Sequence, residues 1–386
     1  MAANKTKISR MDRLYLDEGG FDFIKRSKTW YSITIGLLVV AIAAIAIRGF
    51  SLSLDFEGGT KISLPAADLE EQAVSEVFQE ATGVEPEQVQ IVGSGDSATL
   101  EVNSERLTED QADSARLAIY EEFEPLNPAG EPSPDAVGVS TVSESWGSTI
   151  TQRMVIAMIV FLVIATAYVA FRLQRTMAIA AILALIADGI IIAGLYALFG
   201  LEVSPAVIIG LLTVLTFSIY DSVIVFDKVN ENTEGITGQR NRTFAEQTNL
   251  AINQTVMRSI STSVISALPI IALFVVAVWM MGIGTLRDLA LIQLVGVIEG
   301  IFSSIFLASP LVVTLANRNK KIKEHNAQVA EYRASSKLSG DPVTDNDEHG
   351  NPKRQVVSPA AQQAQQVTNL DGTQVPKSGA SWRPRR

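Results

Sequence analysis

The chain has 386 residues, of which 47% are hydrophobic, and a formal net charge of −10 at neutral pH. It has no cysteine, which excludes a disulfide framework, a thiol catalyst and a cysteine metal site. Its two histidines, His325 and His349, lie in a polar C-terminal stretch, so the apolar segments offer none for a metal centre or a triad. The acidic charge is concentrated in residues 51–150, with 21 Asp and Glu against three basic residues, which argues against nucleic-acid binding.

Residues 1–29 are polar and basic, and an apolar run follows from about residue 30 to residue 47. Basic flanks favour the inner face of a membrane, so we expect a cytoplasmic N-terminal segment and a first membrane helix over residues 30–49. A cleaved signal peptide is the alternative. Against cleavage, the apolar run is long and a strand-like pattern resumes directly after it.

Residues 50–150 follow a single helix, and we therefore expect them to form an extracytoplasmic domain. Their pattern reads strand, helix, strand, strand, helix, strand, which is typical of the α+β ferredoxin-like (βαββαβ) fold. The pair Gly58-Gly59 in LDFEGGT predicts a bulge or a close backbone approach. This fold hosts many functions, so the pattern alone indicates none of them.

Five further apolar runs predict membrane helices 2–6 within residues 151–315; they cover about residues 154–171, 177–199, 203–227, 259–281 and 286–315. Basic residues cluster in an inner loop predicted at 228–258 and directly after the last run, which places both termini in the cytoplasm. Residues 316–386 show no apolar periodicity, and we expect a disordered cytoplasmic tail. The predicted fold class is a multi-pass α-helical membrane protein with six spans and one extracytoplasmic α+β domain.

The run at 203–227 is long enough to span a bilayer, because about 20 residues at 1.5 Å each cover a hydrocarbon core of about 30 Å. It carries one full charge, Asp221, several residues before its polar end. A carboxylate at that depth costs roughly 2.5–3.5 kcal/mol and needs a partner, water or a proton. We interpret Asp221 as a proton- or ion-coupling residue. The alternative is an acid near the helix end that is solvated from the cytoplasm.

Arg258 begins the next run, and consecutive antiparallel helices place it at a depth similar to that of Asp221. We expect its long side chain to reach Asp221 and stabilise the ionised carboxylate. The alternative is an arginine that follows the bias of basic residues toward the inner face. The hydroxyls of the stretch SISTS at 259–263 would hydrate the site or serve as ordinary helix-packing groups.

Two more acids lie inside apolar runs: Asp188 near the middle of the third and Glu299 in the sixth. Asp188 is either a structural polar contact with hydroxyls of neighbouring helices or part of a relay. Glu299 lies within the motif formed by Gly296 and Gly300, where it either faces the same polar interior or contacts a partner helix. No phosphate-binding loop, dinucleotide fingerprint or nucleophile–base pair occurs, so an enzyme, a cofactor and a metal have no positive support.

Several motifs together resemble those of the SecF family of bacterial protein export, part of the SecD/SecF group of the RND superfamily. The resemblance covers about residues 20–315. Its motif after the first helix contains Asp55, Gly58 and Gly59. The matching segments are LDFEGGT at 54–60, ALIADGIIIAGLYALF at 184–199, SIYDSVIVFDKVNEN at 218–232, INQTVMRSISTS at 252–263 and GTLRDLALIQLVGVIEGIFSSIFLASP at 284–310.

The resemblance implies half of a transporter whose other half is SecD, located in the cytoplasmic membrane of a bacterium. The pair would use the proton-motive force to help a preprotein leave the SecYEG channel after SecA has pushed it in. SecD, SecYEG, SecA, YajC, the translocating preprotein and membrane lipids are therefore the expected partners. Asp221 and Arg258 match the positions that the family uses for proton coupling, and Asp188 and Glu299 are further candidates.

Three residues depart from the pattern of many relatives: Ala187 where histidine is expected, Tyr220 where asparagine is expected, and Glu299 at a usually apolar position. Ala187 argues against a histidine-assisted step beside Asp188. Two other functions stay open at this point: half of an exporter for small molecules or lipids, and a structural scaffold without ion coupling. The sequence also leaves the coupling ion open between H⁺ and Na⁺.

Overall fold

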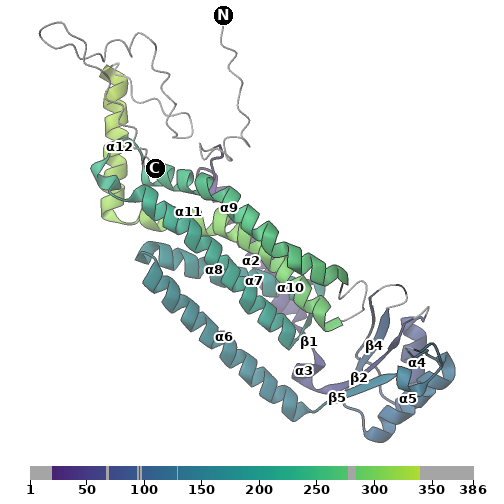
Figure 1. The fold of residues 1–386 in the computed structure, drawn as a ribbon. Coiled ribbons are helices and arrows are strands. Elements are labelled where there is room, and N and C mark those ends of the chain that lie inside the picture. Colours follow the sequence, from purple (N-terminus) through teal and green to yellow (C-terminus); the bar gives the residue numbers. More distant parts are fainter. Residues whose placement is uncertain are drawn as a thin grey trace, which may run out of the picture.

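The computed structural model is a long helix bundle with a small sheet domain at one end (Figure 1). It describes residues 20–66, 69–93, 95, 98–127, 129–276 and 284–339. Six of the described helices are long and apolar enough to cross a membrane, which confirms the predicted number of spans. They comprise α2 (Ser27–Arg48), α6 (Glu144–Arg172), α7 (Arg175–Phe199), α8 (Pro205–Thr233), α9 (Phe244–Leu273) and α10 (Gly284–Phe302), the last continued by a π-helical turn (Ser303–Ala308) and α11 (Ser309–Ala316).

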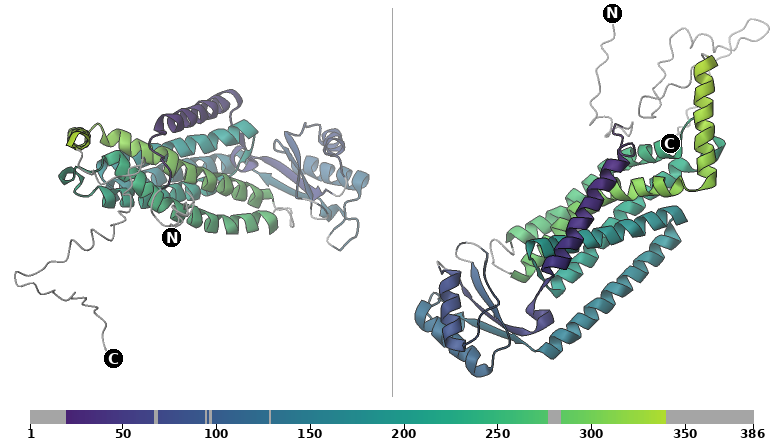
Figure 2. Two further views of the ribbon diagram at one scale, coloured as in Figure 1. Left: turned by 90° about the horizontal axis from the view of Figure 1, so that it is seen from above. Right: turned by 180° about the vertical axis from the view of Figure 1, so that it is seen from behind.

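The central helix of the bundle is α8, which packs against α6, α7, α9 and α10. Its seam with α10 depends on glycine: a Cβ at Gly296 would lie 1.9 Å from Val214, and one at Gly210 would lie 2.4 Å from Ile292. Small residues let two backbones approach closely in a membrane. Helix α2 crosses the back of the bundle against α7, as Figure 2 shows.

Among its described residues, the small domain has four strands and two α-helices, in the predicted order strand, helix, strand, strand, helix, strand. Its antiparallel sheet has the strand order β3-β4-β2-β5. The elements are β2 (Gly59–Pro65), α4 (Glu71–Thr82), β3 (Gln88–Val92), β4 (Thr99–Ser104), α5 (Glu109–Phe123) and β5 (Gly138–Val142). A separate hydrophobic core, which includes the fully buried Ile62, Phe78 and Ile119, packs the helices onto the sheet.

The two glycines after α2 hold the joint between the domain and the bundle. Gly58 and Gly59 have φ angles of 82° and 141°, and a Cβ on Gly59 would lie 2.5 Å from the Ser104 carbonyl oxygen. The predicted close backbone approach is therefore confirmed. Beside it, β1 (Ser51–Leu52) pairs with β6 (Glu202–Val203), and the short helix α3 (Leu54–Glu57) packs against α6.

Two stretches at the end of the bundle away from the small domain are more helical than predicted. Helix α8 continues to Thr233 and α9 begins at Phe244, so much of the inner loop predicted at 228–258 is helical. The start of α9 is stabilised by a capping box between Thr243 and Glu246, a signal that the apolar pattern did not reveal.

The prediction of a disordered tail from residue 316 is wrong for α12 (Lys320–Ser339). Tertiary contacts hold this polar helix: Arg333 donates two 2.8 Å hydrogen bonds to the carboxylate of Glu246, and the His325 ring contacts the Arg242 carbonyl at 3.0 Å. Polar contacts of this kind have no apolar periodicity, so the sequence pattern could not show them. The predicted disorder of residues 340–386 and the character of residues 1–19 lie outside the described residues.

Candidate functional site

Asp221 lies in α8 and is only 6% exposed. Its one hydrogen-bond contact in the described part of the chain is with Ser263 of α9, whose Oγ donates to Oδ2 across a long distance of 3.5 Å. A cavity of about 20 Å³ adjoins the carboxyl group, lined by residues of α8, α9 and α10. That volume suits about one water molecule. The carboxyl group is thus enclosed but weakly coordinated, and it can change partners at little cost.

The expected contact between Arg258 and Asp221 is not formed. The side chain of Arg258 is exposed on α9, and no ion pair joins it to Asp221 among the residues that the structure describes. Ser263, which does contact Asp221, lies five residues further along α9. Five residues turn a helix by about 140° beyond one full revolution, so the two side chains lie on different faces. The expected contact was based on the depth of the two residues in the membrane. It is not formed because the rotation of α9 about its axis turns Ser263, and not Arg258, toward Asp221.

Asp188 lies in α7 and is completely buried. Two hydroxyls donate to its carboxylate: Ser218 of α8 at 2.5 Å, and Ser303, the first residue of the π-helical turn after α10. Wide turns of this kind often occur at functional sites. Three separate segments of the bundle therefore meet at this one carboxyl group.

Glu299 of α10 lies beside Asp188. Two carboxyl groups so close together favour a shared proton, because two ionised carboxylates repel each other. One carboxyl oxygen of Glu299, Oε2, is buried and has no partner in the described part of the molecule. Of the two alternatives for Glu299, its position beside Asp188 favours the one in which it faces the polar interior of the bundle.

Ser218 connects the two acid sites. Its Oγ donates a hydrogen bond to Asp188. Ser218 also lines the small cavity beside Asp221, and Asp221 lies three residues further along α8. The sequence indicated the hydroxyls of α9, and Ser263 is one of them, but it did not single out Ser218 or Ser303. Serines are common in membrane helices, and only the packing of α7, α8 and α10 shows which of them face Asp188.

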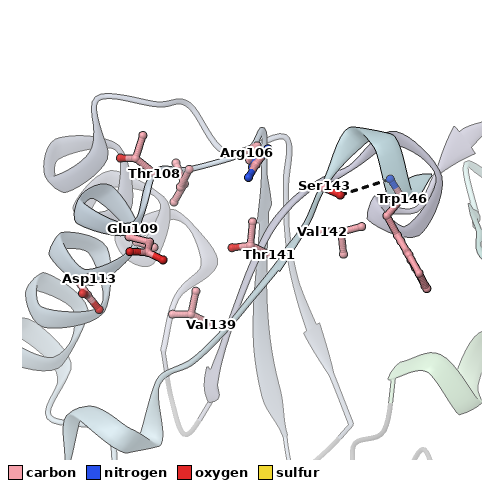
Figure 3. A pocket seen from close by; sticks show the side chains of 11 residues that line it. Arg106, Thr108, Glu109, Asp113, Val139, Thr141, Val142, Ser143 and Trp146 are labelled. Carbon is pink, nitrogen blue, oxygen red and sulfur yellow. Dashed lines mark hydrogen bonds between the residues drawn. The ribbon is translucent and has the colours of Figure 1, made fainter. Parts of the chain in front are cut away.

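The small domain carries a groove of about 880 Å³ between the start of α5 and β5. Figure 3 shows Thr108, Glu109 and Asp113 on one side and Val139 and Thr141 of β5 on the other, with Trp146 of α6 at one end. The indole of Trp146 is largely exposed, and β5 forms an edge of the sheet. An edge strand with exposed side chains is a ready surface for another extended chain.

Comparison with known proteins decides the family. Residues 124–318 match the family described as "Protein export membrane protein SecD/SecF, C-terminal", and residues 43–67 match the "SecD/SecF GG Motif". The chain is 49% identical over 332 residues to the protein translocase subunit SecF of Mycobacterium tuberculosis H37Rv, covering 86% of this chain and 75% of that one. The chain belongs to the SecD/SecF family. The predicted family is thereby confirmed, and Asp55, Gly58 and Gly59 lie within the matched glycine motif.

Other members of the SecD/SecF family extend the likeness. The SecF subunit of Streptomyces coelicolor is 35% identical over 85% of this chain and 86% of its own length. The crystal structure of SecDF from a Thermus species superposes with a TM-score of 0.65 at 31% identity, covering 77% of this chain. This chain spans about two fifths of that longer SecDF chain, with 39% covered.

Proposed function

We propose that this multi-pass membrane protein is an auxiliary subunit of the Sec protein translocase. It works with SecD to use the proton-motive force and complete the export of preproteins through SecYEG. It is an accessory transport component of a bacterial cytoplasmic membrane, with both termini in the cytoplasm. The names of its relatives support the translocase role, and the fused SecDF relative supports SecD as the partner. SecA, YajC, the preprotein and membrane lipids complete the proposed set of partners.

The weak coordination of Asp221 is the observation that carries this proposal. A buried carboxylate with strong, fixed donors would hold one state, whereas Asp221 has a single long contact and a cavity beside it. Such a group can take up a proton, release it and acquire a new partner. Its protonation therefore biases the arrangement of α8 against α9 and α10, which line the same cavity.

Arg258 serves as the alternative partner of Asp221. In the present arrangement Ser263 faces Asp221 and the guanidinium of Arg258 is exposed, which suits a protonated, neutral carboxyl group. Movement of α9 that brings Arg258 to the cavity would stabilise the ionised form. The Asp188–Glu299 pair, linked to Asp221 through Ser218, is a second place where a proton is held.

The outer domain holds or releases the emerging polypeptide as the helices rearrange. The groove beside β5 suits an extended chain, because an edge strand recognises backbone groups whatever the side chains are. The exposed Trp146 lies on α6, so the groove is built partly on a membrane helix. A shift of the bundle would therefore change the groove directly.

Inverted membrane vesicles test the coupling. Late, ATP-independent preprotein movement is measured with and without an imposed proton gradient for wild type, Asp221→Asn and Arg258→Met. Asp227→Asn is the matched control, since Asp227 lies on the same helix but pairs with Arg172 at the surface at 2.6 Å. We expect both coupling variants to assemble with SecD and to lose the effect of the gradient, while the control keeps it. An unchanged gradient effect in Asp221→Asn would contradict the proposal and favour a scaffold.

A further inference from the structure

A polar cavity of about 170 Å³ lies between the sheet of the outer domain and the outer end of the bundle. Its charged lining comes from both sides: Asp55, Lys61 and Glu101 from the domain and its joint, and Glu202, Arg287 and Asp288 from the bundle. At about 30 Å³ per molecule, the space suits several waters. The coupling mechanism proposed above makes no use of this cavity.

The charge in the cavity is negative. Four acids face two bases, a formal balance of −2. Both bases are already paired: Lys61 with Glu101 at 3.2 Å, and Arg287 with Asp288 at 3.3 Å. In the described part of the chain, neither Asp55 nor Glu202 forms an ion pair, so their charge is left to the cavity.

Two helix N-termini reduce this negative charge without cancelling it. Helices α8 and α10 both begin at this end of the bundle, and each N-terminus acts as roughly half a positive charge. Together they offset about one unit, so a net charge of about −1 remains. The cavity therefore contains more negative charge than is needed to neutralise the two helix N-termini.

Ser53 shows that the cavity lacks a polar partner. The residue lines the cavity and is 4% exposed, and its buried Oγ has no hydrogen-bond partner in the described structure. It occupies the N-cap position of α3 but does not cap that helix. A buried hydroxyl without a partner is costly. A hydrated ligand in the cavity would satisfy it.

Burial raises the pKa of Glu202, and the neighbouring acids Asp288 and Glu101 raise it further while Lys61 lowers it. The carboxyl group therefore binds a proton more readily than an exposed glutamate does. Along α7, α8 and α10, the buried apolar residues Ile192, Val207 and Ile292 lie between the end of the bundle that lines the cavity and the level of the Asp188–Glu299 pair. Eleven residues of α10, about 16 Å, separate Asp288 from Glu299.

We propose that this cavity is a hydrated port that draws a small monovalent cation, a proton or Na⁺, from the outside to the outer ends of α8 and α10. These buried apolar residues close the port toward the buried acids in this arrangement. The proposal rests on the ion-coupled function above and names where the ion enters. The test measures how readily cations reach the cavity and does not depend on export. A loss of ion coupling in export and a failure of the cavity to attract cations therefore give different results.

The absence of cysteine makes the test direct. Ser53→Cys is introduced into the complex with a cysteine-free SecD in right-side-out vesicles. Its rates of modification by a cationic aminoethyl methanethiosulfonate and by the neutral methyl reagent are compared. Ser133→Cys, on the surface of the domain, supplies the reference value for the ratio of the two rates. We expect the ratio of cationic to neutral rates at Ser53→Cys to exceed the reference by about tenfold.

Adding Glu202→Gln to the Ser53→Cys variant should lower its ratio of cationic to neutral modification rates by about threefold. Adding Glu131→Gln, on an exposed loop of the domain, should leave this ratio unchanged. Val214→Cys, in the same buried apolar cluster, should react with neither reagent. Slower modification in Na⁺ than in N-methylglucamine at equal ionic strength identifies Na⁺ as the occupant, and equal rates identify the proton. A Ser53→Cys that reacts with neither reagent, or a ratio equal to the reference, would overturn the proposal.

Discussion

Asp188 of α7 and Asp221 of α8 are both buried acids, 33 residues apart along the chain, and their surroundings are opposite. Asp188 is fully buried, accepts hydrogen bonds from Ser218 and Ser303 and contacts Glu299. Asp221 has one contact at 3.5 Å and a small cavity. A satisfied polar network in a low-dielectric interior fixes one arrangement, and an under-coordinated acid permits two. We therefore propose a holding role for the first site and a switching role for the second.

The largest expected effect is on coupling. Asp221→Asn removes the charge and keeps the shape, so gradient-driven export should fall by about tenfold or more while thermal stability changes little. Export in inverted vesicles and the melting temperature of the purified SecD complex measure the two quantities. Equal loss of stability and export would contradict the contrast between the two acids, because Asp221 would then also be a structural residue.

Asp188→Ala should mainly reduce the stability of the bundle, in contrast to Asp221→Asn. It leaves the hydroxyls of Ser218 and Ser303 and the carboxyl group of Glu299 without their shared partner, which should destabilise the bundle by about 2–4 kcal/mol. Differential scanning fluorimetry in detergent measures the shift. Ala187→Ser, at the adjacent position, is a control for helix packing. A melting temperature equal to that of wild type would refute the holding role.

Glu299→Leu should have a smaller effect. One carboxyl oxygen of Glu299 is already buried without a partner, so replacing the group with an apolar side chain should change stability by less than about 1 kcal/mol in either direction. Asp188 keeps both serine donors. We expect export to stay within about twofold of wild type. A loss as large as that of Asp221→Asn would show that the carboxyl pair, rather than Asp221, carries the switch.

The smallest expected effect concerns pH. Because burial raises the pKa of Glu202, the folded chain binds a proton there more tightly than the unfolded chain does. Wild type therefore loses stability as pH rises from below the ordinary value of 4.5 through the raised one. Glu202→Gln should match wild type near about pH 4 and be slightly more stable near about pH 8. Melting curves across this range measure the difference, and parallel curves would refute it.

Much of the membrane topology follows from the sequence. Length and hydropathy alone give the six spans, because each helix must satisfy its own backbone hydrogen bonds in lipid. Alternation and turn residues give the order of strands and helices in the small domain. The rarity of acids in apolar runs singles out Asp188, Asp221 and Glu299 before any packing is known.

The tertiary structure decides which groups meet. Whether Asp221 faces Ser263 or Arg258 depends on the rotation of α9 about its axis, and a pattern of polar residues on one helix does not fix that rotation against its neighbour. The contact of Ser303 with Asp188 depends on the π-helical turn, and α12 depends on Arg333 reaching Glu246. Sequence patterns record what each segment buries, and the partners of a buried polar group are set only when separate segments pack.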